Sequence, residues 1–275
     1  MNTQAFFLPS DSPAGGQRFC LYHPAQGAAA RSAIVYVHPF AEEMNKSRRM
    51  AALQSRAFAQ AGHAVLQIDL LGCGDSSGDF GDASWSAWID DVLLACRWLQ
   101  ERVDAPLCVW GLRAGALLAA EVARRLQTPP QLLLWQPAIM GRQVLQQFLR
   151  LKLAGDMLSG QARGAVETLR AEIASGRAVE IAGYRLAPAL AEGLDRAGLH
   201  PHAGVPSLTW MELSMRDDAE LSPASRNALG RWQEAGCATC ARVVRGPSFW
   251  QTTEIEDAPA LVEATLASSQ AAACA

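Results

Sequence analysis

Short apolar segments alternate with segments of helical periodicity along most of the chain. Residues 33–37 and 64–68 are nearly continuous apolar runs, which is typical of strands buried on both faces of a parallel sheet. Between 85 and 99, apolar side chains recur every three or four positions, which predicts an amphipathic helix. The same alternation predicts strands at 107–110, 132–135, 207–213 and 241–245, and helices at 113–126, 224–234 and 259–267. This order predicts a doubly wound, mostly parallel α/β sheet with helices on both faces.

The first sixty residues add a hairpin and a helix to this pattern. Segments 4–8 and 18–23 flank a stretch rich in Ser, Gly and Pro, which predicts an N-terminal β-hairpin. A helix follows the strand at 33–37, and we expect Ser47 to cap its start and Gly62 to mark its end.

The alternation stops between Ile139 and His202. This segment has helical character and contains no strand long enough to join the sheet. It is too long for an ordinary connection between two elements. We therefore predict a core formed by 1–138 and 203–275, which carries a helical cap insertion at 139–202.

Composition and charge exclude several classes of protein. The chain has 275 residues, 50% of them hydrophobic, and a formal net charge of −3. We do not expect a chain with this mildly acidic net charge to be a general nucleic-acid-binding protein. No apolar run approaches the roughly 18–20 residues that span a bilayer, and the first residues lack the basic and apolar regions of a signal peptide. Seven scattered cysteines fit the reduced thiols of a cytoplasmic protein.

One cysteine pair has a spacing found in metal sites. Cys237 and Cys240 are separated by two residues, but no second pair or nearby histidine completes a zinc site. We interpret them as two ordinary thiols. No metal site and no cofactor is predicted.

Three motifs point to one superfamily of folds. Gly111-Leu-Arg113-Ala-Gly115 lies between a predicted strand and a predicted helix, and the spacing G-x-X-x-G marks a nucleophile elbow. His38-Pro-Phe40 follows the third strand, where α/β-hydrolases place part of the oxyanion hole. The segment 69–76 resembles the D-x-x-G-x-G-x-S turn of that superfamily. Their order along the chain, with a cap after the sixth strand, predicts the α/β-hydrolase fold.

A longer segment resembles one group of proteins within this superfamily. The block from His38 to Met50, HPFAEEMNKSRRM, resembles the signature of the exosortase A system-associated hydrolases. The segments 67–82, 134–137 and 249–250 are similar to the second hydrolase type of that system, and the resemblance runs from about 6 to 265. It implies a cytoplasmic bacterial protein that accompanies the exosortase/PEP-CTERM sorting machinery and exopolysaccharide synthesis, and that nominally acts on an ester, thioester or amide.

The chain departs from this plan at two of the three catalytic positions. The elbow residue is Arg113, whose guanidinium stays protonated and cannot attack a carbonyl. The loop after the last strand carries Trp250, and no histidine follows His202. Only the acid position is kept, by Asp217 or Asp218 after the seventh strand of the hydrolase plan. A Ser-His-Asp mechanism is therefore excluded by residue identity.

The candidate site residues have two interpretations each. Arg113 could bind a carboxylate or phosphate of a ligand, or form an internal salt bridge with Glu212, Asp217 or Asp218. His38 could act as a base or orient a ligand, but a hydrogen-bonded histidine that closes a buried strand is favoured. Trp250 could stack on a ligand or fill the place of the missing histidine. The predicted ligand-binding residues are His38, Phe40, Leu112, Arg113, Glu212 and Trp250.

Two further groups of residues lie near the expected site. A mixed-charge cluster could line the pocket rim, although a solvated surface is the favoured interpretation; it comprises Glu42, Glu43, Asn45, Lys46, Arg48 and Arg49. Apolar cap residues could contact an acyl chain, although packing of the cap on the core is favoured; they are Phe148, Leu149, Leu151, Leu153, Met157 and Leu158.

Three hypotheses for the function follow. The first is hydrolysis by a non-standard route, with water activated by His38 or Asp217 and an oxyanion stabilised by Arg113. The second is a pseudo-hydrolase that binds an anionic or acyl small molecule between sheet and cap. The third is a non-catalytic partner of the exosortase and polysaccharide proteins. The family resemblance favours the first, whereas the residue chemistry favours the second and third.

Overall fold

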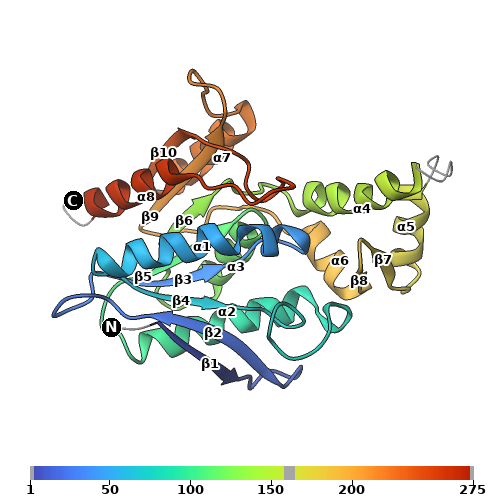
Figure 1. Cartoon of the computed structure of the whole chain (residues 1–275), viewed down its shortest axis with the longest axis horizontal. Helices are drawn as coiled ribbons and strands as arrows, with labels where there is room; N and C mark the ends of the chain where they lie inside the picture. Colours follow the sequence, from blue (N-terminus) through green and yellow to red (C-terminus); the bar gives the residue numbers. More distant parts are fainter. Residues whose placement is uncertain (1–2, 158–164, 273–275) are drawn as a thin grey trace.

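A single eight-stranded sheet forms the centre of the protein. The computed structural model describes residues 3–157 and 165–272, without the side chains of 153–157, 165 and 270–272. The strands lie in the order β1-β2-β4-β3-β5-β6-β9-β10 (Figure 1). Their bounds are β1 (Gln4–Pro9), β2 (Gln17–His23), β3 (Ala33–Val37), β4 (Ala64–Ile68), β5 (Leu107–Leu112), β6 (Gln131–Trp135), β9 (Ser207–Ser214) and β10 (Ala238–Arg245). β2 is antiparallel to β1 and to β4, and the strands from β4 to β10 pair in parallel.

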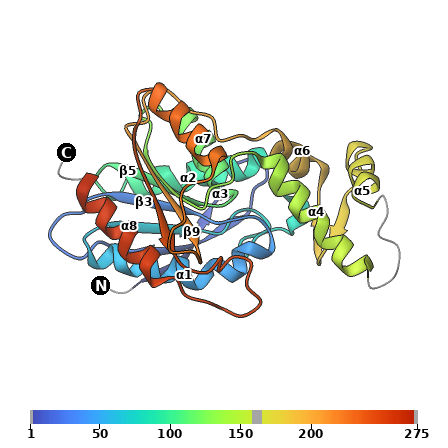
Figure 2. The ribbon, with the colours of Figure 1, turned by 90° about the horizontal axis from the view of Figure 1, so that it is seen from above.

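Helices cover both faces of this sheet (Figure 2). The core helices are α1 (Glu42–Gln60), α2 (Trp85–Gln100), α3 (Gly115–Arg125), α7 (Pro223–Glu234) and α8 (Pro259–Ala272), with a short 3-10 turn η1 (Phe80–Asp82) before α2. Alternate residues of β3 enter two separate cores. Val35 packs in the core shared with α2, α3 and α7, whereas Tyr36 packs in the core shared with α1 and α8. The doubly wound sheet and the N-terminal hairpin are as the sequence predicts.

Two helix starts differ from the prediction. α1 begins at Glu42 and not at Ser47, whose hydroxyl instead donates to the backbone oxygen of Glu43 within the helix, at 2.7 Å. α3 begins at Gly115 and not at Arg113, because Arg113 adopts a left-handed backbone conformation that cannot continue a helix.

The insertion between β6 and β9 projects from one end of the sheet domain in both views. It contains α4 (Gly141–Met157), α5 (Ala165–Ala174), β7 (Val179–Ile181), β8 (Tyr184–Leu186) and α6 (Pro188–Arg196). β7 and β8 form a separate antiparallel pair, so the purely helical prediction missed this hairpin, although neither strand joins the main sheet. Phe148 and Leu149 are buried against the core. Leu158 and the side chains of Leu153 and Met157 lie outside the described residues.

Within the described residues, no helix combines the length and apolar character needed to cross a bilayer.

Two glycines allow the strand β5 and the helix α3 to meet at the elbow. A Cβ atom on Gly111 would lie 2.6 Å from the backbone nitrogen of Ala116, and a Cβ atom on Gly115 would overlap the backbone oxygen of Val37. Both clashes involve backbone atoms, which cannot rotate away. Glycine at 111 therefore permits α3 to start close to β5, and glycine at 115 permits α3 to approach the end of β3.

We expect Gly115→Ala to lower the free energy of unfolding by about 2 kcal/mol or more, because the added methyl group forces α3 away from β3. The matched control is Gly230→Ala in α7, where no atom lies within 4 Å of the added Cβ. That change should raise stability by about 0.5–1 kcal/mol through helix propensity. Urea denaturation of both variants measures the difference, and equal effects would contradict the steric argument.

Candidate functional site

The backbone of the elbow is held at the carboxyl ends of the parallel strands. Arg113 lies between β5 and α3 with φ of 55°, which is strained for a residue with a side chain. Its N–H donates to the backbone oxygen of Trp135 at 3.0 Å, and its own oxygen accepts from Ala116 and Ala138, each at 3.1 Å. These bonds hold the elbow geometry even though no nucleophile occupies it.

The Arg113 side chain is paired with a carboxylate inside the protein. Its Nε and Nη2 atoms both donate to Oε1 of Glu43, at 3.3 and 3.2 Å, and Nη2 also donates to Oε1 of Gln147 at 3.1 Å. The guanidinium carbon lies 5.5 Å from the ring centre of Trp250. Only 12% of the Arg113 side chain and 11% of the Glu43 side chain are exposed, so the pair is largely removed from water.

The partners expected from the sequence were wrong. Glu212 accepts from the Trp210 indole at 2.8 Å and from the Ser225 hydroxyl at 2.5 Å, which holds it toward α7. Asp217 is 76% exposed and pairs with Arg245 at 2.8 Å. Asp218 pairs with Arg216 at the surface. The structure therefore does not bring the acid position of the hydrolase plan to the elbow.

His38 directly follows strand β3 and is buried in the interior of the protein. Its Nδ1 bonds to the backbone oxygen of Pro39 at 2.8 Å, and its Nε2 accepts from the backbone N–H of Leu70 at 3.3 Å. Burial lowers the pKa of the His38 imidazole, and the nearby Asp69 carboxylate partly opposes this effect. With both nitrogens engaged and a proton required on Nδ1, the ring has no free nitrogen with which to activate water.

A cavity of about 360 Å³ lies beside the elbow, between α1, the cap helix α4 and the loop after β10. Its lining includes two of the predicted ligand-binding residues, Phe40 and Trp250, but not His38, Leu112, Arg113 or Glu212. Leu112 is buried in the core on the α1 side of the sheet. The lining residues are Phe40, Glu42, Glu43, Lys46, Val144, Gln147, Phe148, Leu151, Trp250 and Gln251.

The mixed-charge cluster at the start of α1 is part of this site. A solvated surface was the favoured interpretation, and it is wrong for Glu42, Glu43 and Lys46, which line the cavity. The two arginines of the cluster pair elsewhere: Arg48 donates to Asp69 at 2.9 Å, and Arg49 to Asp257 at 2.7 Å.

Two carboxylate oxygens beside the cavity lack hydrogen-bond donors. Oε2 of Glu42 and Oε2 of Glu43 are buried, and neither has a hydrogen-bond partner within the described part of the chain. Burial raises the pKa of both carboxyl groups; for Glu43 the Arg113 charge opposes that rise, and for Glu42 its own backbone N–H and Lys46 do so. Buried acceptors without partners favour a ligand that supplies N–H or O–H groups.

The described residues offer no metal centre. Nowhere in 3–157 and 165–272 do three or more His, Cys, Asp or Glu side chains group as ligands. The Glu42 and Glu43 pair lies beside Lys46 and Arg113, so its negative charge is already balanced by two cations.

We expect Arg113→Met to lower the free energy of unfolding by roughly 3 kcal/mol at neutral pH, because Glu43 would stay buried without its counter-charge. Removing Arg113 raises the pKa of Glu43 further, so the folded variant binds that proton more tightly than the unfolded chain. The loss of stability is therefore largest above that pKa and shrinks as the pH falls through it. Denaturation at about pH 8 and about pH 5 tests the direction.

The control for this prediction is the double variant Arg113→Met/Glu43→Gln, which removes both charges. It should recover more than half of the lost stability. If the double variant lost as much unfolding free energy as Arg113→Met and Glu43→Gln lose together, the two residues would not be coupled.

Comparison with known proteins places this architecture in a family. The profile of the family described as "Serine aminopeptidase, S33" matches residues 28–179, which is more than half of the chain. No curated protein matches the sequence. A thermostable carboxyl esterase from Bacillus coagulans is 13% identical, with 99% of each chain covered and a TM-score of 0.65. Est1E from Butyrivibrio proteoclasticus, solved with ferulic acid, is 14% identical, with 97% of each chain covered and a TM-score of 0.64.

These solved structures share the fold with this chain, and the family match extends from before β3 into the cap. The expected α/β-hydrolase fold is thus confirmed. The chain belongs to the serine aminopeptidase S33 family of the α/β-hydrolase superfamily.

Proposed function

We propose that this protein binds an acyl-bearing small molecule in the elbow cavity and does not hydrolyse it by Ser-His-Asp chemistry. The observation that carries the proposal is the Arg113–Glu43 pair, which occupies the nucleophile position while a cavity of about 360 Å³ remains beside it. A cavity of this size is within the range of small-molecule sites.

The positions of the titratable groups argue against the serine mechanism. The elbow has no hydroxyl, the loop after β10 has no imidazole, and both nitrogens of His38 are engaged. Asp217 faces solvent in a salt bridge with Arg245. At the elbow, no nucleophile is therefore held next to a base, which is the arrangement that acyl transfer requires.

The lining of the cavity favours an amphipathic ligand. Apolar side chains from the core and the cap can receive an acyl chain; they are Phe40, Val144, Phe148, Leu151 and Trp250. Glu42 and Glu43 line the same space, and one oxygen of each carboxylate is buried without a hydrogen-bond partner among the described residues. Since Glu43 already compensates the Arg113 charge, an uncharged head group rich in hydroxyl or amide donors suits this site better than an anionic one.

We also propose that the ligand belongs to the exosortase and exopolysaccharide system. Support comes from the block His38–Met50, the most specific part of the resemblance, because Phe40, Glu42, Glu43 and Lys46 of this block line the cavity. Hydroxyl-rich lipid-linked intermediates have the chemistry that this lining accepts. A binding role as a partner of the sorting or polysaccharide proteins is part of the same proposal.

Hydrolysis by a different route is the second candidate. Burial raises the pKa of the Glu43 carboxyl, and a carboxylate with a raised pKa is a better general base near neutral pH. Its Oε2 has no hydrogen-bond partner among the described residues and lies on a side chain that lines the cavity. In this alternative Glu43 would activate water, and turnover would disappear in Glu43→Gln.

We expect no serine of the protein to react with a fluorophosphonate probe. The reason is that no serine occupies the elbow and no histidine follows His202. Intact-protein mass spectrometry after treatment with an excess of probe is the measurement, with an active serine esterase as the positive control. Stoichiometric labelling of any serine would overturn the proposal.

We expect 1-octanoyl glycerol to bind without release of octanoate, because it combines an acyl chain, an ester and an uncharged hydroxyl head. Gln147→Trp should abolish binding by filling the cavity, whereas Gln146→Trp should not. The two glutamines are adjacent and exposed on α4, but only Gln147 lines the cavity. Calorimetry measures binding, and chromatography of the reaction mixture measures release.

Binding and release of octanoate distinguish ligand binding without hydrolysis from hydrolysis through Glu43. Release of octanoate that is lost in Glu43→Gln would favour the second candidate. Equal binding by both tryptophan variants, or no binding by the wild-type protein, would contradict a ligand site in this cavity.

A further inference from the structure

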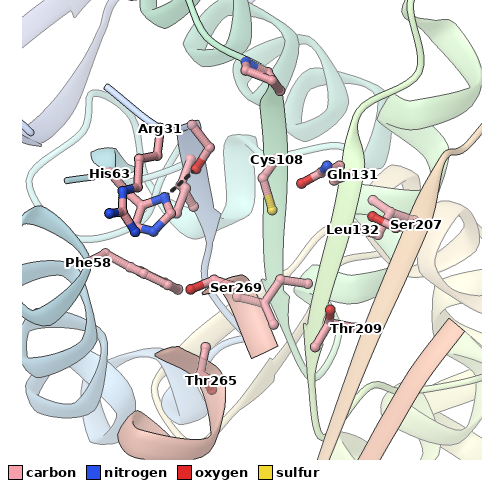
Figure 3. Close-up of a pocket in the computed structure, with 14 residues that line it drawn as sticks. Arg31, Phe58, His63, Cys108, Gln131, Leu132, Ser207, Thr209, Thr265 and Ser269 are labelled. Carbon is pink, nitrogen blue, oxygen red and sulfur yellow. Dashed lines mark hydrogen bonds between the residues drawn. The ribbon is translucent and has the colours of Figure 1, made fainter. Parts of the chain in front are cut away.

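We propose that a second cavity, at the opposite ends of the parallel strands from the elbow, binds a small carboxylate with a short apolar body. This cavity measures about 280 Å³ and lies at the amino-terminal ends of the parallel strands, covered by α1 and α8 (Figure 3). It shares no lining residue with the elbow cavity, which lies at the carboxyl ends. The proposal is independent of the function proposed for the elbow.

The polar end of this cavity carries a buried imidazole with an unused nitrogen. His63 is 4% exposed, and its Nδ1 lies 2.8 Å from the Ser32 hydroxyl. Its Nε2 is buried and has no hydrogen-bond partner among the described residues. When the Ser32 hydroxyl donates to Nδ1, the ring proton resides on Nε2, which then offers a hydrogen-bond donor to a ligand.

The His63 ring is fixed in place before any ligand arrives. The Phe58 ring packs against it edge to face, with centres 5.5 Å apart, and the His63 backbone N–H donates to the Phe58 oxygen at 2.9 Å. Burial and the nearby Arg31 charge lower the pKa of His63. A neutral, immobile donor costs little ordering entropy when a ligand binds.

Arg31 gives this end of the cavity a positive charge. Its side chain is exposed and has no ion-pair partner in the part of the chain that the structure describes. No carboxylate of the described residues lines the cavity either. The charge of Arg31 is therefore uncompensated, unlike that of Arg113 at the elbow, which pairs with Glu43. An uncompensated guanidinium beside an imidazole donor favours a carboxylate.

The rest of the lining sets the size and nature of the ligand body. Ile34, Phe58 and Leu133 supply apolar surface. Thr265 of α8 also lines the cavity, but its hydroxyl already accepts from the Trp135 indole at 3.0 Å. The volume of about 280 Å³ lies just below the ~300–1,000 Å³ typical of small-molecule pockets. A monocarboxylate with a short aliphatic chain meets these limits.

Calorimetric titration with hexanoate tests the proposal, with 1-hexanol and hexylammonium as probes of the same chain and different charge. Hexanoate should bind the wild-type protein more tightly than either. Arg31→Gln should weaken hexanoate binding by roughly tenfold or more, because it removes a charge-assisted hydrogen bond. Arg56→Gln is the matched control, since Arg56 is also exposed near the end of α1 and does not line the cavity.

Nitrogen NMR of the histidine rings locates the bound probe. Hexanoate should shift the Nε2 resonance that His63→Gln removes and leave the resonances of His38 unchanged. The proposal is overturned if hexanoate does not bind, if Arg31→Gln binds it as tightly as wild type, if hexylammonium competes equally, or if the His63 signal does not move.

Discussion

The ion pair between Arg113 and Glu43 is the interaction on which the architecture of the site depends. It joins the turn after β5 to the first turn of α1, and through Gln147 it reaches the cap helix α4. Three parts of the chain that are far apart in sequence thus converge on one guanidinium. Because the pair is nearly enclosed, neither charge can lose its partner without a large cost in free energy.

The backbone around this pair keeps the elbow of the α/β-hydrolase fold. The strained backbone of Arg113, at φ of 55°, is retained, at a cost of about 1–3 kcal/mol for such a conformation. The surrounding hydrogen bonds and the contact of Gly115 with β3 maintain it. His38 supports the same backbone, since its Nε2 accepts from the Leu70 N–H in the turn after β4 while its Nδ1 bonds to the oxygen of the adjacent Pro39.

Periodicity alone was enough to predict the sheet, because β3 and β4 are apolar runs whose neighbours are turn residues. It was not enough for the site. Glu43 and Arg113 are seventy positions apart, and residue types do not specify which of several carboxylates meets a given arginine. Glu43 was assigned to a solvated cluster because its neighbours are charged, whereas its carboxylate is enclosed beside Arg113, whose guanidinium also bonds to Gln147 of the cap. The strands β7 and β8 have only three residues each. An alternation of apolar and polar residues identifies a strand only over about 4–8 residues.

The buried pair also constrains how this sequence can change over evolutionary time. A substitution that replaces only Arg113 would leave the Glu43 carboxylate enclosed without a cation, and one that replaces only Glu43 would leave the Arg113 guanidinium without its anion. Each single change therefore lowers the stability of the fold before the second change can restore it. Positions 43 and 113 are thus expected to change together along a lineage, whereas the cavity-lining residues outside the pair are free to diversify.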